Sequence, residues 1–155
     1  MEEEKLKILL DSIRDRYDFI TTADNAIEAK AGILLGFEIA IIIGFSSSIV
    51  VGLNGIKLAE GILGIVLLAL SIVLLLVVTW PRSYNAFSVN IFEHKDYFEK
   101  TEKDLLNQMI SDSHGATIKN KQKLENKAKV YKWSMFLLIG SIFLITLSKL
   151  SKFYV

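Results

Sequence analysis

The feature that most limits what this chain can fold into is the apolar run ILGIVLLALSIVLLLVVTW at residues 62–80. Its 19 residues include no charged side chain, and Ser71 and Thr79 carry its only hydroxyl groups. A helix of roughly 20 residues crosses the apolar core of a bilayer, which is about 30 Å thick. A helix in a soluble bundle would instead show polar residues every three or four positions on its outer face. The run therefore predicts a transmembrane helix.

Two further runs are of similar length. Residues 31–53 contain one charged residue, Glu38, and residues 133–150 contain only Lys149, near the end of the run. The chain is 52% hydrophobic, above the usual share in soluble domains. Because a charged segment of 30 residues precedes the first run, we expect the spans to be retained and not cleaved as a signal peptide. The sequence predicts an all-α membrane protein with three transmembrane helices.

The distribution of lysine and arginine predicts the orientation. Five precede the first run, one lies between the first two runs, ten fall in residues 81–132 and two follow in the last segment. Positive residues stay in the cytoplasm, so we expect the N-terminus inside and the C-terminus outside. The predicted parts are a cytoplasmic N-terminal amphipathic helix (1–30), a transmembrane hairpin (31–80), a cytoplasmic helical region (81–132) and a third transmembrane helix with a short outer tail (133–155).

The cytoplasmic segments show helical patterns. An a/d stripe in the first segment consists of Leu6, Leu10, Ile13, Tyr17, Ile20, Asp24 and Ile27. It fits a helix that folds onto the chain's own cytoplasmic helices equally well as a seam between subunits. In the middle region we expect a helix from about Asp96, a turn at SDSHG (residues 111–115), and a helix from about Thr117 that continues into the last span.

Six lysines crowd the approach to the last span, and three of them, Lys119, Lys123 and Lys127, recur every four residues on one helical face. Such lysines can simply orient the chain and meet lipid phosphates. Alternatively they form an anion site for a phosphorylated ligand, with Tyr97 and Phe98 available to stack on bases.

The first apolar run has small residues at every fourth position, which permit close helix packing in lipid. They are Gly32, Gly36, Ala40, Gly44, Ser48 and Gly52. The partner is either the second span, with its own Gly61 and Gly64, or another subunit.

Glu38 is the unusual residue of this run, because a carboxylate in the centre of a membrane costs roughly 2.5–3.5 kcal/mol on insertion scales. It could extend toward the headgroups, or it could face water or a protein partner, protonated or paired. Ser46 and Ser47 lie deeper in the same run and could line a polar path. We interpret these three residues as candidates for a pore or gating role.

No enzyme is predicted. The chain has no cysteine, and its two histidines, His94 and His114, are separated by twenty residues. No arrangement of nucleophile, base and metal ligands is recognisable, so we expect neither catalysis nor a cofactor.

Three motifs resemble the Pycsar-type transmembrane effector family of bacterial anti-phage defence, which includes Hailong-type channel effectors. They are Asp24 with Lys30 and Ala31, then Asn90 with Ile91 and Phe92, then Lys129 with Tyr131 and Trp133. The similarity covers residues 16–146. The family often has a polar amide where this chain has Glu38, and no separate cyclic-nucleotide-binding domain is attached here.

The resemblance implies an oligomeric channel in the bacterial inner membrane, a tetramer by analogy. A nucleotide or short oligonucleotide from a partner nucleotidyltransferase or cyclase would gate it, with membrane depolarisation and abortive infection as the result; duplex nucleic acid is not an expected ligand. The alternative is a non-conducting membrane scaffold that holds a soluble partner through its cytoplasmic helices.

Overall fold

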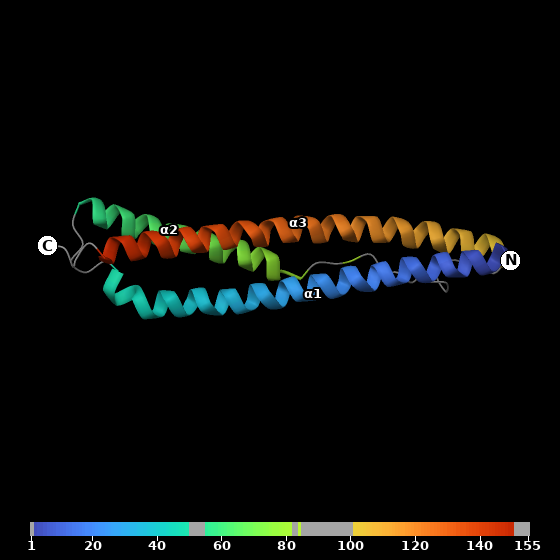
Figure 1. Cartoon of the computed structure of the whole chain (residues 1–155), viewed down its shortest axis with the longest axis horizontal. Helices are drawn as coiled ribbons and strands as arrows, with labels where there is room; N and C mark the ends of the chain where they lie inside the picture. Colours follow the sequence, from blue (N-terminus) through green and yellow to red (C-terminus); the bar gives the residue numbers. More distant parts are fainter. Residues whose placement is uncertain (1, 50–54, 82–83, 85–100, 151–155) are drawn as a thin grey trace. The chain divides into compact units, whose positions relative to one another are not determined.

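The computed structural model describes residues 2–49, 55–81, 84 and 101–150, and in these ranges it contains three α-helices and no strand. The helices are α1 (Glu2–Ile49), α2 (Ile56–Thr79) and α3 (Glu102–Leu150) (Figure 1). Packing groups the chain into two units. Unit 1 comprises Met1–Ala26 and Pro81–Asn126, and unit 2 comprises Ile27–Trp80 and Lys127–Val155. Residues of α1 and α3 therefore belong to both units, whereas α2 belongs to unit 2 alone.

The ends of the helices follow from local chemistry. Gly55 precedes α2 with a φ of 59°, a conformation that glycine adopts without steric cost. Trp80 is extended before Pro81, so α2 ends at Thr79, as expected from the proline. At the start of α3, the backbone N–H of Asp104 donates to Thr101 Oγ1 over 3.2 Å, and the Thr101 hydroxyl donates to Asp104 Oδ2 over 2.6 Å. Thr101 therefore caps α3, and the predicted start near Asp96 lies outside the described residues.

The predicted turn at residues 111–115 is wrong, because α3 continues through it without a break. Gly115 in a helix interior costs only about 1 kcal/mol relative to alanine, which tertiary packing readily offsets. Ser113 is 2% exposed, and Thr117 donates its hydroxyl to the Ser113 carbonyl over 2.7 Å. Ser113 of the predicted turn therefore lies on the packed face of a continuous helix, whereas Ser111, Asp112 and His114 are exposed on it.

A seven-residue repeat determines which face of α3 is buried. One buried row consists of Leu106, Ser113, Asn120, Lys127, Ser134, Ser141 and Ser148. A spacing of seven keeps the same face of a helix against its neighbours in a left-handed bundle. In α2, the buried residues 61, 64, 68, 71, 75 and 78 follow the same rule. Most members of the α3 row are small or polar, which is unusual for a packed face.

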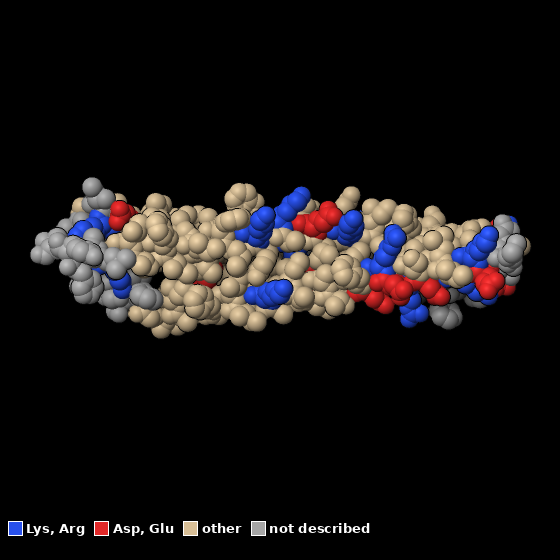
Figure 2. Space-filling model, in the orientation of Figure 1, with Lys and Arg blue, Asp and Glu red and all other residues tan. Residues whose placement is uncertain are grey.

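Unit 2 packs α2 against α1 and α3 around Ala31, Leu75 and Val78. Its outer surface is apolar, with Ile33 and Ile43 each more than 70% exposed and Phe143 62% exposed. Figure 2 shows few charged side chains over this surface apart from those near its ends. Only 33% of the most apolar stretch of α2 and 22% of that of α3 are buried in the chain. A core helix of a soluble protein would be mostly buried, so these faces suit lipid.

Two helices, Lys57–Thr79 and Glu102–Lys149, are long and apolar enough to cross a membrane. The described part of the chain is thus all-helical and has the length and composition of a membrane protein. The predicted first span lies at the end of α1, and part of it is outside the described residues. The arrangement with three spans remains a prediction.

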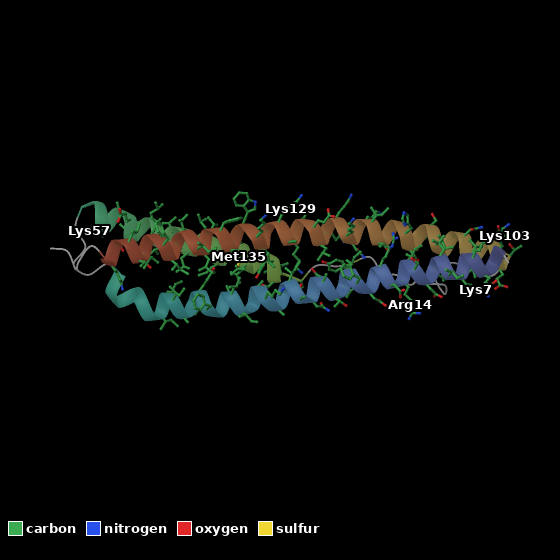
Figure 3. The ribbon with its side chains drawn as sticks, viewed as in Figure 1. Lys7, Arg14, Lys57, Lys103, Lys129 and Met135 are labelled. Atoms are coloured by element: carbon green, nitrogen blue, oxygen red, sulfur yellow. The ribbon has the colours of Figure 1, made fainter. Side chains whose placement is uncertain are left out.

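Unit 1 is formed by the first part of α1 and the first part of α3. Ile13, Ile20 and Leu106 are its buried apolar residues, and Asp24 is also buried. The other members of the predicted stripe in α1 are half-buried. Charged residues such as Lys7, Arg14 and Lys103 lie on its surface (Figure 3). Lys7 Nζ lies 3.3 Å from Glu102 Oε1, with both side chains 61% exposed.

Candidate functional site

Glu38 lies at the meeting point of the three helices of unit 2. Its side chain is 0% exposed, although it is surrounded by the most apolar part of the chain. The Ser71 Oγ atom of α2 lies 2.6 Å from Glu38 Oε1 and 2.9 Å from the carbonyl oxygen of Ser134 on α3. Ser134 donates its own hydroxyl to the Tyr131 carbonyl of the same helix. One serine hydroxyl therefore connects α1, α2 and α3.

Hydrogen-bond counting limits the chemistry of this cluster. The Ser71 hydroxyl has a single proton, and the Ser134 carbonyl can only accept. An ionised Glu38 would also be an acceptor, so only one of the two contacts could then be a hydrogen bond. Both are satisfied when Glu38 is protonated and donates to Ser71 Oγ, which in turn donates to the Ser134 carbonyl. This neutral chain of hydrogen bonds avoids an isolated charge among apolar helices.

A second polar contact of unit 2 joins Glu28 of α1 to Lys127 of α3. Lys127 Nζ and Glu28 Oε1 are 2.5 Å apart, and the lysine side chain is 0% exposed whereas that of Glu28 is 37% exposed. A buried ammonium needs such a partner, because an uncompensated charge in a low-dielectric environment is expensive.

The predicted lysine face is therefore not formed as expected. Lys127 is buried against Glu28, so it cannot share an exposed surface with Lys119, whose side chain is exposed. Lys123 is half-buried, and its Nζ lies 5.7 Å from the centre of the Tyr84 ring. The proposed base-stacking residues Tyr97 and Phe98 lie outside the described residues. The anion-binding role of this face remains a prediction for Lys119 and Lys123.

The small-residue ladder of α1 faces away from the rest of its own unit. Gly32, Gly36, Ala40 and Gly44 are all exposed. A Cβ atom added to any of these three glycines would meet nothing within 4 Å. Within the described residues, the alternative that these glycines pack against the second span is therefore not seen. Gly52 lies outside the described residues, as do the side chains of Ser46, Ser47 and Ser48.

Close packing inside unit 2 instead uses Gly64 of α2. A Cβ atom there would lie 2.8 Å from Ile145 Cγ1 and 3.3 Å from the Ser141 carbonyl oxygen of α3. Gly140 of α3 is also near α2, because a Cβ atom added to it would lie 3.6 Å from Leu67 Cδ1. Small residues at these points let the two backbones approach, as is common for helices in lipid.

The sequence reasoning missed Glu28, Ser71 and Ser134. A usable signal existed, because the a/d stripe of the N-terminal segment reaches Glu38 when its register is extended past Ala31, and Ser134 lies seven residues after Lys127. Extended in this way, the pattern would have placed Glu38 on the packed face of the helix.

The comparisons with known proteins agree with the membrane character of unit 2. The family model of the Pycsar effector protein domain matches residues 17–151, which is most of the chain. No curated protein and no solved structure matches the sequence. The matched domain is the transmembrane domain of a non-enzymatic effector. The chain therefore belongs to the Pycsar effector family and is a membrane protein of anti-phage defence.

Proposed function

We propose that the chain forms an oligomeric ion channel of the bacterial inner membrane, opened or closed by a nucleotide or short oligonucleotide. A partner nucleotidyltransferase or cyclase makes the ligand during infection, and ion flow then depolarises the membrane and ends phage production. The N-terminus and unit 1 lie in the cytoplasm, and the C-terminus lies outside.

The observation that carries the proposal is the buried Glu38 with its bonds through Ser71 and Ser134. Polar residues inside a membrane are costly and are usually kept for function. A protein that only held a soluble partner would need no polar link among its membrane helices. Glu38 is enclosed within one chain, which favours gating over direct lining of a pore. Ionisation of Glu38 would remove one of the two bonds and loosen the contact between α1, α2 and α3.

The outward-facing ladder of α1 supports self-association. An exposed stripe of small residues on an apolar helix permits the close approach of a second helix. Within the described residues nothing in the same chain covers Gly32, Gly36 or Gly44. A second copy of the chain is the proposed partner, and a tetramer is the expected assembly.

Unbroken helices provide a route for control. Because α1 and α3 are continuous, a ligand that shifts their residues in unit 1 can change the helix contacts in unit 2. Lys119 and Lys123 are the predicted phosphate contacts on α3.

Potassium flux from liposomes that contain the purified chain tests the channel. We expect flux that changes on addition of cyclic or linear nucleotides. An absence of flux under every nucleotide would reject the channel and favour the scaffold.

Glu38→Gln tests the role of the carboxyl group. Glutamine can keep both hydrogen bonds but cannot ionise, so gating or cation selectivity should change. Unchanged currents in this variant would assign Glu38 a packing role.

A further inference from the structure

Two adjoining cavities in unit 1 have no role in the site described above. The larger, of about 440 Å³, lies between α1 and α3. The smaller, of about 310 Å³, lies beside it and shares Ile13, Arg16 and His114 as lining residues. Pockets for small ligands usually measure about 300–1,000 Å³. Each cavity is therefore large enough for part of a small organic molecule.

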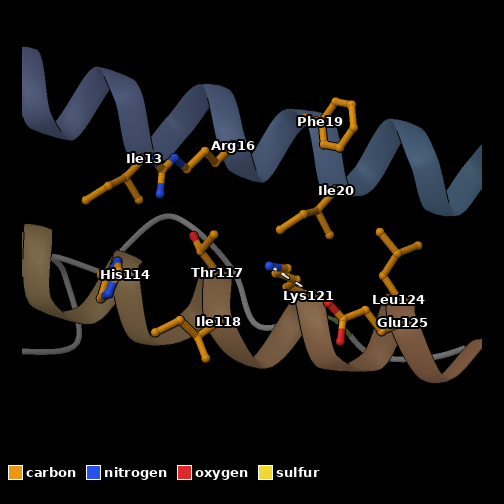
Figure 4. A pocket seen from close by; sticks show the side chains of 10 residues that line it. All are labelled: Ile13, Arg16, Phe19, Ile20, His114, Thr117, Ile118, Lys121, Leu124 and Glu125. Atoms are coloured by element: carbon orange, nitrogen blue, oxygen red, sulfur yellow. Dashed lines mark ion pairs between the residues drawn. The ribbon is translucent and has the colours of Figure 1, made fainter.

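The larger cavity combines an apolar floor with a cationic edge (Figure 4). Ile20 from α1 and Leu124 from α3 project into the space between the helices. Phe19 also lines the cavity; its ring is 73% exposed and points away from α3 in Figure 4, so it stands at the rim. Such a ring offers a face on which a nucleic-acid base can stack.

The polar lining carries two cationic side chains, Arg16 and Lys121, beside the imidazole of His114. Glu125 is the single acidic residue of the larger cavity. Glu125 already pairs with Lys121, with Oε1 and Nζ 3.8 Å apart. Arg16 and His114 make no ion pair with any described residue, so their N–H groups are available to a ligand. A guanidinium is well suited to phosphate, because it can donate two parallel hydrogen bonds.

The smaller cavity adds the hydroxyl groups of Ser12 and Ser111. Arg16 and His114 therefore stand where two cavities meet, each cavity with its own polar and apolar lining. A ligand that fits has a phosphate in the middle and a planar group on one or both sides.

We propose that these cavities bind a nucleotide, with its phosphate between Arg16 and His114 and its base against Phe19. The proposal rests on the proposed function and assigns the ligand to a site separate from the lysine face. A dinucleotide, or two residues of an oligonucleotide, places its second base in the smaller cavity and binds more tightly than a mononucleotide.

Binding of fluorescein-labelled dinucleotides carrying each of the four bases to the full chain in detergent tests the site. Unlabelled mononucleotides and inorganic phosphate serve as competitors. For at least one dinucleotide, Arg16→Gln should weaken binding at least about tenfold, because it removes a charged hydrogen bond to phosphate. Arg14→Gln is the matched control, since Arg14 is exposed two residues away and lines neither cavity; its affinity should equal that of the wild type.

Phe19→Ala should weaken binding about five- to tenfold through loss of stacking, and Phe19→Trp should restore it. Ile8→Ala is the control for loss of an exposed apolar side chain on α1. Circular dichroism of each variant checks that its helix content equals that of the wild type. We expect the variants to fold, because Arg16 and Phe19 are exposed.

The outcomes separate this site from the proposed function. If the wild type binds a dinucleotide and Arg16→Gln binds it equally well, the site is wrong while the nucleotide-gated channel stands. If Lys119→Gln loses binding while Arg16→Gln binds as well as the wild type, the ligand belongs to the lysine face and the proposed site is wrong. If the wild type binds no dinucleotide, the site is wrong, and the proposed function then depends on another nucleotide, which the liposome flux measurement tests.

Discussion

The two units expose opposite kinds of residue on the same two helices, although each unit buries apolar and polar side chains together. In unit 1, Ile13 and Ile20 are buried while charged side chains lie on the surface. In unit 2, the surface is apolar while Glu38, Ser71 and Lys127 are among the fully buried residues. A charged surface is favoured in water, where exposed apolar groups are unfavourable. An apolar surface is stable in lipid, because contact with acyl chains carries no such cost. Helix association in unit 2 therefore depends on polar contacts and small residues.

The largest expected effect comes from the buried ion pair of unit 2. Glu28→Ala removes the carboxylate that pairs with the buried ammonium of Lys127, which should cost about 3–5 kcal/mol of stability. Glu125→Ala breaks an ion pair of unit 1 whose side chains are 67% and 56% exposed, and should cost about 0.2–1 kcal/mol. Thermal unfolding in detergent measures both. Equal effects would show that the two units do not differ in this way.

The loss of the Glu38 contact should have the next largest effect on stability. Glu38→Ala removes the group next to Ser71 and should cost about 1–3 kcal/mol. Glu38→Gln should retain most of that stability, since its amide N–H can donate to Ser71 Oγ while Ser71 donates to Ser134. Thermal unfolding of the two variants in the same detergent measures the difference in their stability. A glutamine variant as unstable as the alanine variant would contradict the neutral hydrogen-bond chain.

Variants at two glycines distinguish helix packing within the chain from helix packing between chains. Gly64→Ala places a Cβ atom 2.8 Å from Ile145 and should cost about 1–3 kcal/mol. Gly36→Ala meets open space and should preserve or slightly raise helix stability, by up to about 1 kcal/mol. The assembly of the Gly36 variant should nevertheless weaken, as measured by cross-linking in membranes. If assembly is unchanged, the small residues of α1 do not lie at the subunit interface.

The smallest effect belongs to the surface of unit 1. Lys7→Ala breaks the exposed pair with Glu102 and should cost about 0.2–1 kcal/mol, a difference that high salt should remove. Unfolding at low and high ionic strength measures it. A larger cost that persists in salt would mean that unit 1 also depends on desolvated charges.

Much of this architecture could be predicted from the sequence. The apolar run at residues 62–80 identified α2, and Pro81 defined its end, because both depend only on local chemistry. The family was also recognisable from short motifs. The break at residues 111–115 was predicted wrongly, since single-residue preferences near Gly115 are weaker than the packing of a long helix.

Helix content and the apolar character of the spans were thus determined by the sequence itself, through hydrogen-bonding and transfer free energies that act residue by residue. The a/d register could place Glu38 on a packed face, but which groups of the neighbouring helices meet that face was decided by the tertiary structure. Packing supplies a hydroxyl for Glu38 and a carboxylate for Lys127. Those partners lie 33 and 99 residues away in the chain, beyond the reach of any local pattern.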